Sequence, residues 1–223
     1  MTEDRGQGTG DLRPGSVVKR VPGQDAPGQP RVAVLALQGD YEAHARALAA
    51  YGIAAHQART VADLDGIDGL VLPGGESTTM LKLMEGTGLA DRVRELAAAG
   101  TPLLATCAGV ILLAREVGNP PQPSLGILDV KVERNAYGRQ AESTVTMLTV
   151  EDAAALGDSP LEGVFIRAPR IVAPGPAVEV LARRSADPVL VRQGRVLAAT
   201  FHPELSARSA VIGLFAAMTG GRR

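Results

Sequence analysis

Residues 102–114 read PLLATCAGVILLA, an apolar run that passes through the small residues around Cys107 into a second apolar run. A short, continuous apolar run is typical of a strand that is covered on both faces, and the second run suits a buried helix. The stretch therefore predicts a strand over 102–106, a sharp turn at Cys107 and a helix over 110–114.

The same alternation of strand and helix extends towards the N-terminus. Apolar runs at residues 32–37 and 69–72 predict two more buried strands. Apolar residues at helical spacing predict a helix over 41–51 and helical turns around Met80 and Val93. Strands that alternate with helices form parallel sheets, so the order predicts an α/β fold with a doubly wound, mostly parallel sheet.

The second half of the chain is expected to add short antiparallel strands. Residues 144–147 alternate between polar and apolar side chains, and Gln193-Gly194 suits a hairpin turn. A last helix is predicted with Val211, Leu214, Phe215 and Met218 on one face. The strands predicted in this half are residues 127–133, 144–150, 165–167, 178–183, 189–192 and 196–200.

Domain boundaries follow from composition. Residues 1–30 are rich in Gly, Pro, Asp and Gln and cannot bury enough apolar surface to offset the entropy lost on ordering, so we expect a flexible tail. The chain has 223 residues, which suffice for one well-buried α/β core. We therefore expect a single domain over 31–219 and a short tail over 220–223.

Bulk composition excludes several classes of function. A net charge of −1 and 3% aromatic residues argue against nucleic acid or an anionic membrane as partner. The single cysteine rules out an intrachain disulfide and suits a reducing compartment. No apolar run approaches the roughly 20 residues that span a bilayer. We expect a cytoplasmic protein without metal or cofactor.

Cys107 is the first candidate catalytic residue. It sits where a strand turns through small residues into a helix, the arrangement of a nucleophile elbow with cysteine in place of serine. The helix N-terminus would stabilise a thiolate and offer backbone N–H groups to an oxyanion. The alternative is that Cys107 is a small buried hydrophobic residue, as most free cysteines are.

A possible base follows the last predicted strand, in the stretch Phe201-His202-Pro203-Glu204. In extended chain, residues two apart point the same way, so Glu204 can orient the imidazole of His202. A catalytic cysteine needs such a base. The alternative is a surface turn. His44, in a predicted helix, and His56 are less attractive candidates.

Residues 73–79, PGGESTT, are the third feature. Two glycines end a strand and hydroxyl residues open a helix, so backbone N–H groups can approach a ligand closely. The alternative is a tight turn with a helix cap. Phosphate binding is disfavoured because the loop holds no lysine.

Six stretches together resemble one family. They are LQG at 37–39 with His44 after it, LPGGESTTM at 72–80, TCAG at 106–109, VERNAYGRQ at 132–140, VFIRAP at 164–169 and FHPEL at 201–205. The chain resembles the class I, triad-type glutamine amidotransferases, and more narrowly the glutaminase subunits of pyridoxal 5′-phosphate synthase. The resemblance covers residues 31 to about 218.

The resemblance implies hydrolysis of L-glutamine to glutamate and ammonia, which passes to a synthase subunit in a large hetero-oligomer. Cys107 would be the nucleophile, His202 the base and Glu204 the residue that orients it. Gln38 would support the site at the face that meets the synthase. The matched glutamine-binding positions are Gly75, Glu76, Ser77, Ala108, Arg134, Ile166 and Arg167.

Two other functions stay open at this point. The same fold could serve a γ-glutamyl hydrolase or another small-molecule cysteine hydrolase, although such an enzyme has no need of the 132–140 motif. A non-catalytic binding subunit with a relic pocket is disfavoured, because Cys107, His202 and Glu204 all stand at their matched places.

Overall fold

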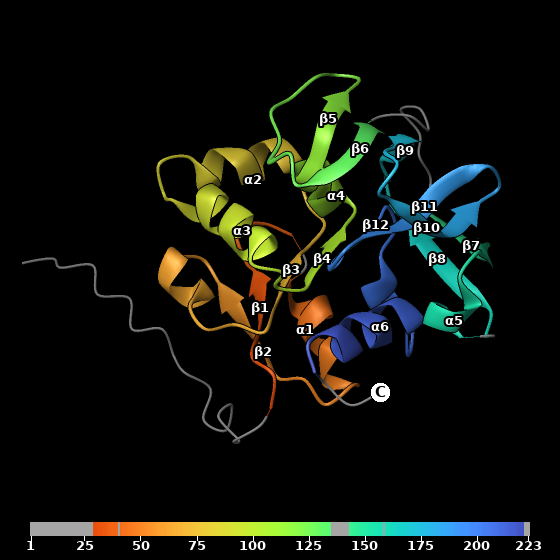
Figure 1. Cartoon of the computed structure of the whole chain (residues 1–223), viewed down its shortest axis with the longest axis horizontal. Coiled ribbons are helices and arrows are strands. Elements are labelled where there is room, and N and C mark those ends of the chain that lie inside the picture. Colours follow the sequence, from red (N-terminus) through yellow and green to blue (C-terminus); the bar gives the residue numbers. More distant parts are fainter. Residues whose placement is uncertain (1–28, 40, 135–142, 158, 221–223) are drawn as a thin grey trace, which may run out of the picture.

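A nine-stranded sheet runs through the middle of the molecule in the order β2-β1-β3-β4-β12-β11-β10-β7-β8 (Figure 1). The structure is a computed structural model and describes residues 29–39, 41–134, 143–157 and 159–220. Most of the two predicted tails, 1–30 and 220–223, lies outside these residues, so the tails stay predictions, as does the single domain over 31–219.

One half of this sheet is parallel, as its apolar strands predicted. β4 lies between β3 and β12, and Ala199 of β12 stands opposite Thr106 of β4. The carboxyl ends of these strands therefore meet at one edge of the sheet. The parallel strands are β1 (Val32–Leu35), β2 (Ala55–Ala58), β3 (Gly69–Leu72), β4 (Leu103–Thr106) and β12 (Val196–Ala199).

The other half of the sheet is antiparallel and comes from the second part of the chain. The predicted hairpin turn joins β11 to β12, with Gln193 opposite Val196. The antiparallel strands are β7 (Thr144–Val150), β8 (Leu161–Phe165), β10 (Glu179–Arg184) and β11 (Asp187–Gln193). A separate three-stranded sheet contains β5 (Ala114–Gly118), β6 (Leu128–Glu133) and β9 (Arg170–Pro174).

Helices cover both faces of the large sheet (Figure 1). Because side chains alternate along a strand, Val32 and Val34 of β1 pack on one face and Ala33 and Leu35 on the other. The first face carries α1 (Tyr41–Ala49), α5 (Ala153–Leu156) and α6 (Ala210–Met218). The second carries α2 (Ser77–Met84), α3 (Leu89–Ala98), α4 (Ala108–Leu113) and the small sheet. Two 3₁₀ helices, η1 (Val61–Leu64) and η2 (Pro203–Leu205), lie in the connections.

The predicted fold class is confirmed, and the differences concern short elements. The strand predicted over 165–167 is wrong, because β8 ends at Phe165 and the backbone of Arg167 turns to a φ of +46°. Strands β2, β5 and β9 were not predicted. All three lie at the edges of the two sheets. β2 and β5 mix polar and apolar residues and so lack the continuous apolar run of a central strand, whereas β9 has a short apolar run that ends in Pro174.

The turn from β4 into α4 depends on a close approach at Gly109. A Cβ atom at this position would lie 2.2 Å from the carbonyl oxygen of Leu72, at the end of β3. The neighbour is backbone, so only a shift of the strand or helix could make room. Gly109 thus lets α4 start directly against the edge of the sheet, which fixes where Cys107 stands.

We predict that Gly109→Ala lowers the free energy of unfolding by about 1–3 kcal/mol, the usual cost of forcing an extra carbon into a packed site. The measurement is the midpoint of urea unfolding. Gly118→Ala is the matched control, because the nearest atom to its added Cβ is 4.0 Å away. Equal midpoints for the two variants would contradict this account of Gly109.

Candidate active site

All the residues predicted for the site line one cavity of about 360 Å³. They arrive on loops that follow β1, β3, β4, β6, β8 and β12. The lining residues named from the sequence are Gln38, Gly75, Glu76, Ser77, Cys107, Ala108, Arg134, Ile166, Arg167, His202 and Glu204, and Gly39, Gly74 and Ile111 join them. Ends of parallel strands gather at one edge of a sheet, which explains why residues distant in sequence meet here.

Cys107 stands in a backbone conformation that L-residues rarely adopt, with φ at +47°. Its amide donates to the carbonyl of Ala199 on β12 at 2.9 Å, so the strained residue is held by the neighbouring strand. The residue is 7% exposed and its sulfur lies 3.8 Å from the Ile166 carbonyl oxygen. The turn therefore presents the sulfur to the cavity while the rest of the residue stays buried.

His202 follows β12 and lines the same cavity as Cys107. Its amide donates to the Val164 carbonyl at 2.8 Å, and its Nδ1 lies 2.7 Å from Oε1 of Glu204. Burial by itself would lower the pKa of His202, but the bonds to Cys107 and Glu204 and their charges outweigh it and raise the pKa to about 10. The structure thus brings the three predicted groups to one cavity, with His202 and Glu204 in direct contact.

Gly74 makes room for this contact. A Cβ atom on Gly74 would lie 2.7 Å from Cε1 of His202 and 3.4 Å from the Cβ of Cys107. The backbone at the end of β3 therefore packs directly against both His202 and Cys107. Gly74, the first glycine of the Gly-Gly pair, is therefore needed for close packing at the site, which a simple tight turn would not require.

The Glu76 carboxylate is held by its own helix. It accepts from the amide of Thr79 at 2.8 Å and from the hydroxyl of Thr78, so it caps α2. Its hydrogen bond from the Thr78 hydroxyl, with those from Thr79, lowers the pKa of Glu76 to about 2 against the opposing effect of burial. Arg134 pairs with its other oxygen at 3.1 Å. The cavity therefore contains a fixed negative charge beside a fixed positive one.

Gln38 and the end of β8 complete the lining. The side-chain oxygen of Gln38 accepts from the amide of Glu76 at 2.5 Å, which ties the β1 loop to the β3 loop. Ile166 is 37% exposed, at the turn where Arg167 leaves β8. Of the predicted 132–140 motif, residues 135–140 lie outside the described part of the chain.

His44 was set aside from the sequence, and the structure places it directly behind the site. It is fully buried in α1, and its Nε2 lies 3.4 Å from Oε1 of Glu204. One sequence signal could have identified it: His44 is one helical turn from Leu48, on the face that enters the core.

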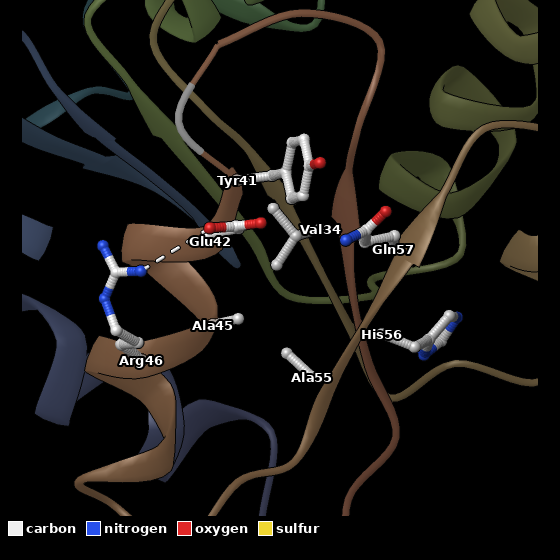
Figure 2. A pocket seen from close by; sticks show the side chains of 8 residues that line it. All are labelled: Val34, Tyr41, Glu42, Ala45, Arg46, Ala55, His56 and Gln57. Atoms are coloured by element: carbon white, nitrogen blue, oxygen red, sulfur yellow. Dashed lines mark ion pairs between the residues drawn. The ribbon is translucent and has the colours of Figure 1, made fainter. Parts of the chain in front are cut away.

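A second hollow, of about 300 Å³, lies between α1 and the edge strand β2 (Figure 2). Glu42, Ala45 and Arg46 of α1 line it, and Figure 2 shows Ala45 on the side of α1 that faces Ala55. Glu42 pairs with Arg46 at 3.8 Å. Both partners are more than two-thirds exposed, and no predicted site residue lines this hollow. The candidate site is therefore the cavity lined by Cys107 and His202.

The described residues contain no group of three His, Cys, Asp or Glu side chains arranged to hold a metal ion. Among the same residues, no helix is both long and apolar enough to cross a membrane.

An α/β sheet that gathers a cysteine, a histidine and a glutamate at its carboxyl edge fits the glutamine amidotransferase class. A family model described as the SNO glutamine amidotransferase family matches residues 34–219. The chain belongs to this family and is an enzyme, which confirms the resemblance inferred from the sequence.

Named relatives and solved structures agree. "Pyridoxal 5'-phosphate synthase subunit PdxT" of Thermus thermophilus is 55% identical over 177 residues, 78% of this chain and 90% of the relative. The protein of that name from Thermotoga neapolitana is 48% identical over 176 residues, 79% of this chain and 92% of the relative. A crystal structure of a glutamine amidotransferase has a TM-score of 0.78 at 49% identity, covering 85% of this chain and 98% of its own.

A more distant structure shows the fold alone. It is the structure of PurLQS from Thermotoga maritima, in which one chain has a TM-score of 0.64 at 16% identity, covering 84% of this chain and 97% of its own.

We predict that the His202 ring stays protonated through neutral pH and titrates near pH 10, where its pKa is raised from 6.5 to about 10. The charged ring then stabilises the fold fully below pH 6.5, and this contribution is lost as the pH rises through 10. In Cys107→Ala the titration should move to lower pH, because the bond to sulfur is gone, yet stay above 6.5 because Glu204 remains.

The measurement is an NMR titration of the three histidine rings, with the His202 signal identified from its loss in His202→Gln. A wild-type ring that titrates near its ordinary value, or a titration unchanged in Cys107→Ala, would show that the contact with the sulfur is absent.

Proposed function

We propose that this chain is the glutaminase subunit of a pyridoxal 5′-phosphate synthase, which hydrolyses L-glutamine and delivers ammonia to a separate synthase subunit. The observation that carries the proposal is that Cys107 shares one cavity with the hydrogen-bonded pair of His202 and Glu204, beside the opposed charges of Arg134 and Glu76. The names of the relatives, which cover most of this chain, support the synthase as the destination of the ammonia.

The first half-reaction uses Cys107 as nucleophile. A sulfur that has given its proton to His202 attacks the side-chain amide carbon of glutamine and forms a C–S bond. The carbon–nitrogen bond then breaks, and the nitrogen leaves as ammonia with the proton of the His202 imidazolium. The raised pKa of His202 suits this step, because the ring holds the proton until the leaving group takes it.

The second half-reaction returns the enzyme to its starting state. Neutral His202 removes a proton from water, and the resulting hydroxide attacks the thioester carbon. The C–S bond breaks, glutamate is released, and the sulfur is again beside a protonated imidazole. Glu204 contacts Nδ1 of the ring at 2.7 Å and so keeps the imidazole oriented through both half-reactions.

Two backbone donors are proposed for the tetrahedral intermediate. The amide of Ala108 opens α4 directly after the nucleophile, and Gly75 lines the same cavity from the β3 loop. Donors of this kind act where charge develops on the substrate oxygen. Ser77, Ile166 and Arg167 are proposed to contact the rest of glutamine.

Arg134 and Glu76 match the two charged groups of an amino acid. The guanidinium of Arg134 can take the α-carboxylate in a two-point contact, and the Glu76 carboxylate can accept from the α-ammonium. Because the two side chains already pair at 3.1 Å, they hold each other in place before glutamine binds. The pair selects a free amino acid over a bare amide.

Gln38 is proposed to lie at the face that meets the synthase, in a large hetero-oligomer. Its contact with the amide of Glu76 would carry a movement of the β1 loop to the glutamine-binding loop. We also propose a cytoplasmic location, on the grounds that a lone catalytic thiol needs a reducing compartment.

Cys107→Ala is expected to reduce glutamine hydrolysis by a factor of at least about 1,000, because the nucleophile of a covalent mechanism is lost. The assay is ammonia release from glutamine, with and without the cognate synthase subunit. We expect wild-type turnover to rise on adding the synthase. Circular dichroism checks the fold of the variant. Turnover retained in the variant would exclude Cys107 as nucleophile, and equal wild-type rates with and without the synthase would exclude coupling.

The same assay, run with γ-glutamyl peptides in place of glutamine, separates the rival hydrolase function. Faster turnover of the peptides than of glutamine would favour a γ-glutamyl hydrolase.

Arg134→Ala is expected to raise the KM for glutamine roughly ten- to a hundredfold with a smaller change in kcat, since charge-assisted hydrogen bonds contribute about 1.5–3 kcal/mol. Arg134→Lys should recover part of the lost affinity, because lysine keeps the positive charge but cannot make the two-point contact of a guanidinium. Arg115→Ala is the control: that arginine pairs with Asp129 outside the cavity. An unchanged KM in Arg134→Ala would remove Arg134 from the glutamine site.

A further inference from the structure

We propose that His44 is a positioning residue of the active site, which holds the Glu204 carboxylate in the orientation that His202 requires. The inference rests on the proposed triad and adds a fourth side chain to it. His44 touches neither the cavity nor the sulfur, so it acts through Glu204.

The placement of His44 separates it from the solvent side of its helix. Glu42, Ala45 and Arg46 of α1 line the surface hollow of Figure 2, whereas His44 and Leu48 on the same helix are completely buried. A fully buried imidazole is costly unless its ring nitrogens bind partners. The partners of Nε2 therefore show what the residue is for.

Two oxygens lie near Nε2 of His44. Oγ1 of Thr106 is 3.1 Å away and Oε1 of Glu204 is 3.4 Å away. An ionised carboxylate can only accept, so the contact with Glu204 is favourable only when Nε2 carries the proton. With the proton on Nε2, the tautomer that this inference assigns to His44, the ring N–H lies beside the same oxygen that contacts His202 at 2.7 Å.

Oε1 of Glu204 is consequently held between two imidazoles. The Glu204 side chain is 2% exposed, so little water is present to replace either donor. Without His44 the carboxylate could rotate about its side-chain bonds and lengthen its bond to Nδ1 of His202. That bond fixes the tautomer of the base and stabilises its charge.

Thr106 gives His44 a second link to the chemistry. Thr106 is the last residue of β4 and directly precedes Cys107, and it is fully buried. One ring nitrogen thus contacts both the strand that carries the nucleophile and the carboxylate that orients the base. His44 fixes the loop after β12 relative to β4, beyond the backbone pairing of the two strands.

The test compares His44→Phe, which removes the donor, with His44→Gln, whose side-chain amide can replace Nε2–H. His44→Phe should lower kcat roughly ten- to a hundredfold, as loss of a partner that orients a reactive group commonly does, and leave the KM for glutamine nearly unchanged. His44→Gln should recover most of kcat. His56→Phe is the matched control, because His56 binds the Asp63 carbonyl outside the site at 2.8 Å.

A second readout separates positioning from packing. The titration of His202, followed by NMR, should shift to lower pH in His44→Phe and return towards the wild-type value in His44→Gln. Only the Gln variant has a side-chain N–H that can hold the Glu204 carboxylate in its orientation. If His44 only filled space in the core, its substitution would change thermal stability but neither kcat nor the titration of His202. Wild-type kcat in His44→Phe, or equal kcat losses in the Phe and Gln variants with no shift of His202, would overturn the inference.

If His44→Phe does not fold, His44→Asn replaces it, because the shorter amide cannot reach Glu204; equal kcat in the Asn and Gln variants would then overturn the inference. A wild-type complex that releases no ammonia from glutamine would instead reject the proposed function. In that case the His202 titrations would still decide whether His44 holds Glu204.

Discussion

The pairing of β4 with β12 is the constraint on which the site depends. The two strands are far apart in sequence yet parallel neighbours, with Thr106 opposite Ala199. That register sets Cys107 beside the loop that carries His202, and the Cys107 amide binds the end of β12. A slip of one residue would turn every side chain of β12 to the opposite face. Apolar side chains on both faces of the sheet, in two separate clusters, hold the register in place.

The site balances the cost of burial against charge. Removing His202 from water disfavours its charged form, and the structure offsets this with a sulfur and a buried carboxylate rather than with exposure. The Glu204 carboxylate needs donors in turn: it contacts Nδ1 of His202 at 2.7 Å, and Nε2 of His44 lies 3.4 Å away. Arg134 and Glu76, nearer the solvent, compensate each other's charge. Each ionised group therefore stands next to an opposite charge or a donor.

Patterns along the chain predicted the parts of this arrangement that depend on local sequence. Buried strands show as apolar runs, and the loops after them carry polar and small residues, so β1, β3, β4 and their loops could be placed. Pairs that join separate loops, such as Arg134 with Glu76, leave no periodic signal. His44 was set aside for the same reason: its partner lies on a distant loop. Edge strands such as β2, with His56 and Gln57 among its residues, resemble loops in composition.

The place of β12 in the sheet has a consequence for how the protein is made. Synthesis proceeds from the N-terminus, so the strand carrying the nucleophile exists long before its neighbour has been translated. Until β12 inserts, the edge of β4 facing it is an unpaired template for other chains, and the thiol lacks its base. A ribosome that stalls before β12 would release a fragment that is aggregation-prone and inert towards glutamine. Chaperone demand should therefore peak late in translation, when most of the sheet has emerged and its central gap is still open.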